Sequence, residues 1–252
     1  MKYLLIAAFT SLLLWGCAAS VDTTNMTPSQ RLGYATKLYN NKDYEDALKE
    51  YQAILLQFPG STVIDSAQYY LAMTRYKRSE YILAAYEFSR LIKNMPSSKY
   101  VPDAQFMLAD CYFLLSPDYA LDQKYTKKSI QEFQAFIDFF PTDPKVPEAE
   151  KKIAELNDKL AHKEYHNAYI YEKLEDYKAA LIYYNLVLDN YHDTKYAPLA
   201  MYSKINLLIQ RKQNSEALAE ISKFIERYPE DSHLKEIEQL KTKLEAKVSA
   251  AK

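Results

Sequence analysis

The sequence predicts an all-α fold, a solenoid of five helix-turn-helix repeats closed by a C-terminal capping helix. The first observation behind this prediction is composition: the 252 residues include only three glycines. A sheet of many hairpins needs glycine at turn positions of positive φ, so this scarcity favours helices joined by short connections. The second observation is a pattern of small and apolar residues that recurs five times along the chain.

Charge and glycine content narrow the classes of function. The chain carries 32 Lys and Arg against 33 Asp and Glu, so its overall field gives no reason to expect nucleic acid or an anionic membrane surface as a partner. A phosphate-binding loop or a dinucleotide fingerprint needs clustered glycines, and the sequence has none. We therefore expect a protein that binds other proteins.

The N-terminal end has the features of a lipoprotein signal peptide. Lys2 precedes an apolar run over residues 3–14, which has the length of a signal h-region and is short for a membrane span. The run ends in Leu14-Trp15-Gly16-Cys17, which resembles a bacterial lipobox. We expect residues 1–16 to be removed and Cys17 to carry the acyl chains. The alternative is an ordinary signal peptide followed by an incidental cysteine.

The residues after the lipobox suggest where the protein is held. Residues 17–27 are mostly small and polar and read as a lipidated N-terminus with a flexible tether. Ala18 stands where an aspartate would signal retention in the inner membrane. The lipobox resemblance therefore implies a lipid anchor in the outer membrane, facing the periplasm.

The second helix of each repeat carries the clearest pattern. In the first copy Ala47 is followed by Tyr51 and Ile54, and these steps of four and three place the residues on one helical face. Pro59 then ends the helix. The small position recurs as Ala47, Ala84, Ser129, Ala180 and Ala217, and a second series in the preceding helices is Ala35, Ala72, Ala109, Ala168 and Ile205. The pattern resembles the tetratricopeptide repeat.

Two irregularities in spacing predict local expansions. Ala109 and Ser129 are 20 positions apart where Ala35 and Ala47 are 12 apart, so we expect an expanded turn over residues 116–122 in the third repeat. About four extra helical turns over residues 147–163 extend the first helix of repeat four. We expect residues 28–146 to hold repeats one to three, and residues 147–252 to hold repeats four and five with a capping helix.

These features together resemble one family. The lipobox, the five repeats, the expanded third turn and the long helix are similar to the BamD family of outer-membrane β-barrel assembly lipoproteins. The segments that carry the resemblance are residues 121–133 and Phe58-Pro59 with residues 67–72. Membership would imply a non-enzymatic periplasmic adaptor that binds the barrel insertase BamA, other subunits of the assembly machinery, and unfolded barrel precursors. It would need no cofactor beyond the covalent lipid on Cys17.

In tetratricopeptide repeats the first helix of each pair lines the concave surface. Counting from the small positions of the first three repeats gives a candidate peptide-binding groove rich in aromatic rings, which bury large area at low entropy cost. Its residues are Leu32, Thr36, Tyr39, Tyr69, Met73, Tyr76, Phe106, Asp110 and Phe113. The alternative is that these rings pack between adjacent repeats as core.

The sequence offers little for catalysis, and we predict no catalytic or metal-binding residue. His162 and His166 are four apart, but a zinc protease helix needs Glu directly after the first His, and no third ligand is apparent. We expect them on a solvated charged face, and the pair Lys151-Lys152 likewise. Cys111 lies in an apolar run and is expected in the core.

Two other functions remain open at this point. A pilotin, or another envelope scaffold lipoprotein, also combines a lipobox with tetratricopeptide repeats, although it has no evident need for the long fourth-repeat helix. A metallohydrolase built on His162 and His166 is the enzyme alternative, which the metal content of the purified protein would test.

Overall fold

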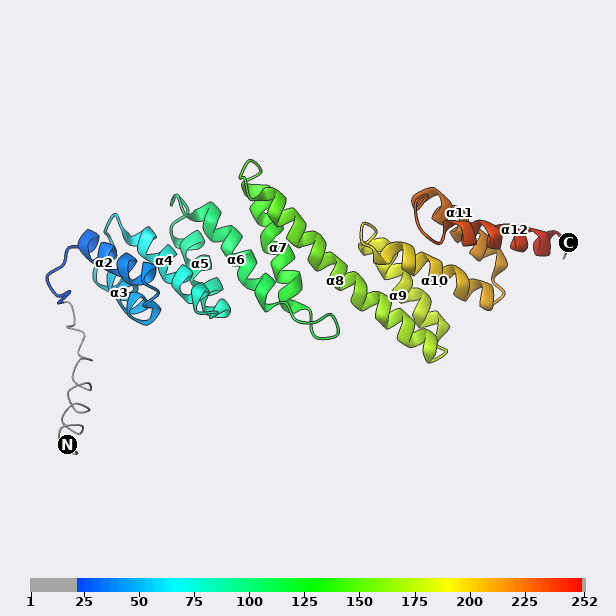
Figure 1. The fold of residues 1–252 in the computed structure, drawn as a ribbon, viewed down its shortest axis with the longest axis horizontal. Coiled ribbons are helices and arrows are strands. Elements are labelled where there is room, and N and C mark those ends of the chain that lie inside the picture. The colour runs from blue at the N-terminus through cyan, green and yellow to red at the C-terminus, as the bar shows by residue number, and fades with distance from the viewer. Residues whose placement is uncertain (1–21, 251–252) are drawn as a thin grey trace, which may run out of the picture. The chain divides into compact units, whose positions relative to one another are not determined.

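The computed structural model describes residues 22–250, and the expected signal peptide (1–16) and Cys17 lie outside them. The described residues form eleven helices and no strand, which confirms the all-α prediction (Figure 1). The helices are α2 (Pro28–Asn40), α3 (Tyr44–Gln57), α4 (Ile64–Lys77), α5 (Tyr81–Asn94), α6 (Val101–Leu115), α7 (Lys124–Phe139), α8 (Val146–Lys173), α9 (Tyr177–Asn190), α10 (Tyr196–Gln210), α11 (Asn214–Arg227) and α12 (Leu234–Ala250). Among them, none combines the length and the apolar character that crossing a membrane requires.

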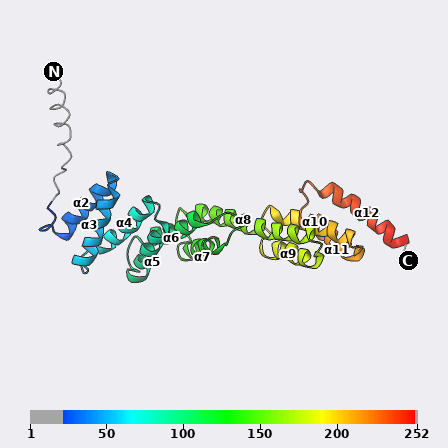
Figure 2. The ribbon, with the colours of Figure 1, turned by 90° about the horizontal axis from the view of Figure 1, so that it is seen from below.

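The helices follow one another as five helix-turn-helix pairs and a final single helix, as predicted: α2 with α3, α4 with α5, α6 with α7, α8 with α9, α10 with α11, and then α12. The chain divides into two compact units within α4, the first ending at Leu71 and the second beginning at Ala72. In the second unit consecutive helices lie side by side in both ribbon views (Figures 1 and 2).

The small and aromatic positions found in the sequence form the cores. All ten residues of the two series, nine of them small and the tenth Ile205, are fully buried. The large residues four positions after the second-helix series are buried beside them, as Tyr51, Phe88, Phe133, Tyr184 and Ile221. A small side chain lets the paired helices approach, and a large one fills the space beside it.

Turns within the pairs use the left-handed region without glycine. Lys42, Ser79, Glu175 and Lys212 have φ between 60° and 67°, one in each pair except the third. Each closes the first helix in the same way, as when the amide of Lys42 donates to the carbonyl of Tyr39 at 3.0 Å. Positive φ therefore occurs in this chain at residues other than glycine. Each such residue costs about 1–2 kcal/mol of backbone strain.

The third pair has the predicted expanded turn, and the structure shows it docked on α8. Gln123 organises the loop, since its Nε2 donates to the carbonyls of Asp118 at 2.7 Å and Leu121 at 3.0 Å. Lys163 of α8 reaches the Leu121 carbonyl at 2.7 Å, and the ring of Tyr119 stacks on His162 at 3.7 Å. The loop is therefore fixed at several points along one helix.

The long first helix of repeat four is α8, which has 28 residues where its partner α9 has 14. Its first half contributes Ala149 to a cluster with Phe133 and Phe136, and its second half contributes Ala161 and Ala168 to the core of α9 to α12. One continuous helix thus contributes buried residues to two separate cores. The expected boundary between residues 146 and 147 stays a prediction.

Candidate functional site

The predicted groove residues lie on the first helices α2, α4 and α6, and we call those of either unit its first-helix face. In the first unit Leu32 and Tyr39 of α2 pack against the core that Tyr51 and Ile54 occupy. The ring of Tyr39 meets the ring of Tyr70 edge-on at 5.6 Å, and Tyr69 meets it at 5.4 Å. These side chains remain half-buried, so each keeps part of its surface exposed.

Thr36 is bound to the core of the first unit by a hydroxyl contact. The hydroxyl of Tyr51 donates to Thr36 Oγ1 at 3.4 Å. Burial raises the pKa of Tyr51 to about 12, so this phenol stays protonated as a donor. Thr36 therefore accepts a hydrogen bond from a core tyrosine, and it is also partly exposed.

In the second unit a buried carboxylate joins three first helices. Asp110 of α6 accepts a hydrogen bond from the hydroxyl of Tyr76 on α4 at 2.6 Å. Its other oxygen accepts from Lys152 of α8 at 2.5 Å, and the Lys152 ammonium lies 4.4 Å from the centroid of the Phe113 ring. Burial first, and then the hydrogen bond to Asp110, raise the pKa of Tyr76, which therefore remains a donor.

Two of the predicted groove residues lie inside rather than on the surface. Phe106 is only 6% exposed, and its ring packs against Phe133 and Phe136 with centroids 5.4 Å away in both cases. Asp110 is likewise 6% exposed and satisfied by its two donors. For Phe106 the alternative of packing within the core therefore applies. Asp110 fixes its neighbours instead of offering a free acceptor.

The remaining face of the second unit is formed by Met73, Tyr76 and Phe113, all half-buried. These three side chains combine an apolar or aromatic body with partial exposure, which is the character expected of an anchor site for a peptide. Their role in peptide binding stays a prediction.

Lys152 is a residue of this face that the sequence did not reveal. It was expected on a solvated surface, but its side chain is largely buried between Asp110 and Phe113. A signal was available, because α8 begins Val146-Pro147-Glu148-Ala149 where α6 begins Val101-Pro102-Asp103-Ala104. The start of α8 therefore repeats the start of a first helix.

The repeated start of α8 differs from that of α6 in one respect, because no second helix in the described part of the chain covers its small residue. Ala104 is followed five residues later by Ala109, which is fully buried and whose carbonyl accepts from Ser129 of α7 at 3.0 Å. Ala149 is followed at the same distance by Ala154, which is exposed. The second helix that would cover Ala154 is absent from this place, because α9 packs on the later half of α8, where Ala168 is the buried small residue.

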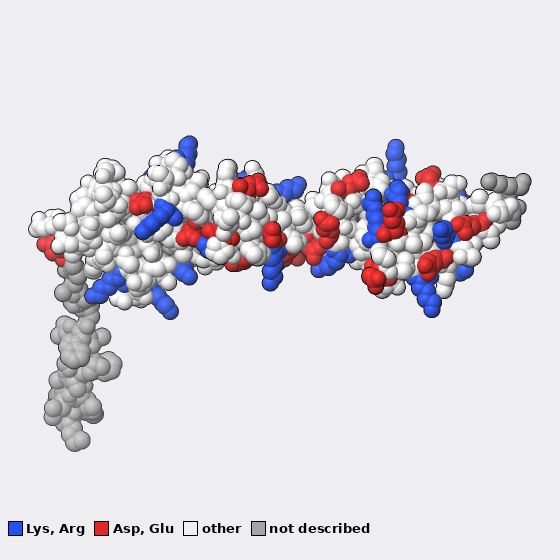
Figure 3. Space-filling view, turned by 90° about the horizontal axis from the view of Figure 1, so that it is seen from above, with Lys and Arg blue, Asp and Glu red and all other residues white. Residues whose placement is uncertain are grey.

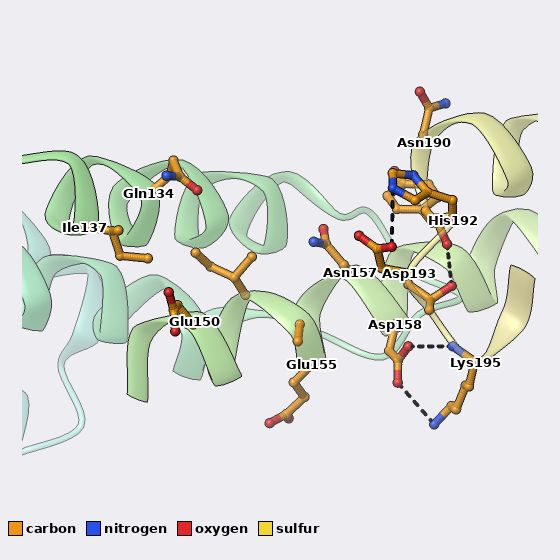
Figure 4. A pocket seen from close by; sticks show the side chains of 14 residues that line it. Gln134, Ile137, Glu150, Glu155, Asn157, Asp158, Asn190, His192, Asp193 and Lys195 are labelled. Atoms are coloured by element: carbon orange, nitrogen blue, oxygen red, sulfur yellow. Dashed lines mark hydrogen bonds and ion pairs between the residues drawn. The ribbon is translucent and has the colours of Figure 1, made fainter. Parts of the chain in front are cut away.

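A cavity of about 530 Å³, the α8 cleft, lies where that helix is missing (Figure 4). It is bounded by α7, by the middle of α8 and by the turn between α9 and α10. Its lining is Gln134, Ile137, Glu150, Ile153, Ala154, Glu155, Asn157, Asp158, Asn190, Tyr191, His192, Asp193, Thr194 and Lys195. The lining therefore combines apolar side chains from α7 and α8 with several carboxylates.

The charges of the cleft are mainly negative. Glu150, Glu155, Asp158 and Asp193 line it, whereas Lys195 is its only lysine or arginine and lies 3.5 Å from Asp158. Elsewhere, acidic and basic side chains are interspersed on the molecular face drawn in Figure 3. The cleft thus offers a local acidic rim on a chain whose overall charge is balanced.

His162 and Cys111 pack against other side chains of the protein. The His162 ring is half-buried and lies between those of Tyr119, at 3.7 Å, and Tyr196, at 4.7 Å, so only part of its surface meets solvent. Within residues 22–250 no group of three His, Cys, Asp or Glu side chains is arranged to hold a metal ion. Cys111 is fully buried, as predicted, and burial raises the pKa of its thiol.

Comparison with known families agrees with the repeat architecture. Residues 24–215 match the model of the family YfiO, described as an outer membrane lipoprotein. The chain belongs to this family. The outer membrane protein assembly factor BamD of Rickettsia prowazekii (strain Madrid E) is 26% identical over 208 residues, which are 82% of this chain and 83% of that protein. The YfiO match includes the first-helix face, the docked loop and the α8 cleft.

Solved structures with similarity include other helical repeat proteins. The TPR domain of P58(IPK) is 15% identical with a TM-score of 0.44, covering 88% of this chain and 56% of that one. A thermophilic TPR protein of Thermus thermophilus is 18% identical with a TM-score of 0.37, covering 87% and 98%. The TPR2AB domain of yeast Sti1 is 14% identical with a TM-score of 0.40, covering 86% and 98%.

Proposed function

We propose that this protein is a non-catalytic adaptor lipoprotein of the outer-membrane β-barrel assembly machinery. It is held at the periplasmic face of the outer membrane by lipid on Cys17, and it binds the barrel insertase and unfolded barrel precursors. The observation that carries the proposal is membership of an outer membrane lipoprotein family, together with a match to an assembly factor over 82% of the chain.

The first-helix face of each unit, taken by itself, is a proposed site for precursor segments. Tyr39 and Tyr69 in the first unit, and Met73, Tyr76 and Phe113 in the second, are half-buried and keep exposed surface. Barrel strands carry an apolar side chain at every second position, and such rings can bury these side chains. The Asp110 to Lys152 ion pair holds Tyr76 and Phe113 in fixed positions, so less ordering entropy is lost when a segment binds.

The α8 cleft is the proposed docking place of the insertase. Its exposed Ala154 and its apolar floor leave room for an element of a partner, since no second helix covers this part of α8. The acidic rim selects a segment that presents basic side chains around a small apolar edge. The long helix is the feature that separates this proposal from a pilotin, which has no evident need for it.

Affinity capture from native membranes tests the proposal. The tagged wild-type protein should recover the insertase, and depletion of the protein should lower the levels of barrel proteins. Replacing Ala154 with Trp should fill the cleft and lower insertase recovery by roughly tenfold or more. Ala246→Trp is the matched control, because Ala246 is an exposed alanine of α12 outside the cleft.

Two results would count against it. Recovery of a peptidoglycan-bound or pilus complex in place of the insertase would favour the scaffold or pilotin alternative. Equal recovery with Ala154→Trp and Ala246→Trp would move the insertase contact away from the α8 cleft. Unchanged circular dichroism in both variants is needed for the comparison.

A further inference from the structure

The outward side of α5 is unusually apolar for an exposed helix. Ile82 is 56% exposed and Tyr86 is 60% exposed. At the same positions of α3, a repeat earlier, the chain has Glu45 and Lys49. Polar residues are the ordinary choice for a solvated helix face, so two large apolar side chains one turn apart mark a surface with another purpose.

These side chains border a small cavity between α5, α6 and α7, which we call the α5–α7 pocket. It measures about 280 Å³, and its lining is Ile82, Ala85, Tyr86, Ser89, Tyr112, Lys124, Tyr125 and Lys128. The rings of Tyr112 and Tyr125 are stacked, with centroids 6.0 Å apart and planes 15° apart, and form a flat wall. This volume is near the lower limit for small-molecule sites, so it suits one large side chain of a partner better than a free ligand.

The charged side chains that line the pocket are positive. Lys124 and Lys128 of α7 line it, and the lining contains no Asp or Glu. The Lys128 ammonium lies 5.0 Å from the centroid of the Tyr112 ring, and the Arg90 guanidinium lies 5.8 Å from that of Tyr86.

Two carboxylates lie near residues of this lining: burial first, and then the charge of Glu132, raise the pKa of Tyr112, and Asp122 accepts from the backbone amide of Lys124 at 3.0 Å. Glu132 of α7 accepts from the side-chain amide of Gln105 at 2.8 Å, and Glu87 of α5 pairs with Arg90 at 3.0 Å. Within the described residues neither Lys124 nor Lys128 forms an ion pair, which leaves both ammonium groups available to an incoming anion.

We propose that the α5–α7 pocket is a docking site for an acidic partner segment, in which one aromatic or aliphatic side chain is flanked by Asp or Glu. The side chain enters the pocket against Tyr112 and Tyr125, and the flanking carboxylates meet Lys124 and Lys128. The opposite charge of this pocket and of the α8 cleft makes them selective for different partners. The inference goes beyond the proposed function, and failure of insertase capture would leave it intact.

Fluorescence anisotropy with synthetic peptides and the full mature chain tests this site. The probe is a fluorescein-labelled peptide in which Phe-Leu is flanked on both sides by Asp-Glu. It should bind the wild-type protein, and Lys128→Glu should weaken binding roughly tenfold or more, because a like charge replaces the attracting one. Ile82→Ser should weaken it by a similar factor through loss of apolar contact.

Lys127→Glu is the matched control for the charge reversal. Lys127 is exposed on the same helix but does not line the pocket, so its reversal should change the affinity by less than about twofold. A probe with Ala-Ala in place of Phe-Leu should bind weakly, and a probe with Lys-Arg flanks should not bind.

Several outcomes would overturn the proposal. Equal weakening by Lys127→Glu and Lys128→Glu would reduce the effect to a general field. Equal binding of the Ala-Ala probe would show that no side chain enters the pocket. Binding to vesicles of phosphatidylglycerol without binding to the peptide would make this face a lipid contact, and concentration-dependent self-association lost in Ile82→Ser would make it a contact between copies of the chain.

Discussion

Lys152 of α8 and Asp110 of α6 are joined by a charge-assisted hydrogen bond of 2.5 Å, and Tyr76 of α4 donates to the same carboxylate at 2.6 Å. These contacts connect the first helices of three successive pairs. The carboxylate is nearly inaccessible to water, so its charge depends on those two donors for compensation. The network therefore holds Tyr76 and Phe113 of the proposed binding face in place.

Removal of the Lys152 charge should cost substantial stability. Lys152→Met keeps the length of the side chain but leaves Asp110 buried with one donor, so we expect the free energy of unfolding to fall by about 2–4 kcal/mol. Urea unfolding followed by circular dichroism measures this. Lys151→Met is the control, because Lys151 is exposed and its loss should cost less than about 0.5 kcal/mol. Equal losses in the two variants would show that the ion pair contributes little.

The aromatic residues of the first-helix face should divide into anchors and core. Tyr69→Ala should weaken binding of an aromatic-bearing precursor peptide by roughly 1–3 kcal/mol and leave the helical circular dichroism intact. Phe106→Ala should instead lower stability by about 3–5 kcal/mol, since its ring is buried against Phe133 and Phe136. Peptide titration and urea unfolding of both variants measure the two effects. Loss of fold in Tyr69→Ala, with unchanged affinity per folded molecule, would make Tyr69 a core residue too.

The repeat pattern in the sequence was sufficient to predict the helix pairs and their cores. Close packing of two helices requires a small residue at the crossing and a large one beside it. Ala109 with Phe133 meets this requirement, and so does Ala35 with Tyr51. The expanded turn and the long helix were predicted by the same pattern, since each appears as a change in the spacing of these residues.

The contacts between side chains of distant helices could not be predicted in this way. Counting from Ala109 placed Phe106 in the groove, whereas its ring turns into the core formed with α7. Lys152 was assigned to solvent because its carboxylate partner lies 42 positions away on another helix. Such partners depend on which part of α8 faces α6. With Ala168 as the only small position assigned to this helix, the sequence pattern did not predict that the earlier part of α8 faces α6.

The lipid anchor is a prediction that depends on residues outside the described part of the chain. Cys17→Ser should abolish labelling with radioactive palmitate and release the protein into the soluble periplasmic fraction, because stable attachment needs two or more acyl chains. Palmitate labelling is the deciding measurement, since a partner could retain the variant at the membrane. Cys111→Ser is the control and should label as the wild type does, because Cys111 is buried. Undiminished labelling of Cys17→Ser would exclude the lipobox.

The docking of the third-pair loop on α8 should weaken as the pH falls below neutral. His162 holds Tyr119 of this loop, and burial first, then the charges of His166 and Lys195, lower the pKa of its imidazole against an opposing effect of Asp118. Burial is the largest of these effects and the one that release of the loop relieves, so the imidazole binds its proton more readily when the loop is released. Docking is therefore fully favoured above the ordinary histidine pKa of about 6.5 and weakens as the pH falls through that value towards the lowered one.

Hydrogen exchange of the backbone amides of residue 116 and residues 118–123, corrected for intrinsic rates, measures this docking. Protection should be lower at about pH 5.5 than at about pH 7.5. His162→Phe keeps a ring between Tyr119 and Tyr196 but cannot titrate, so its protection should be independent of pH. His192→Phe, at an exposed histidine, should respond to pH as the wild type does. Greater protection at low pH would show that attraction between the imidazolium and the two tyrosine rings outweighs desolvation and the neighbouring positive charges.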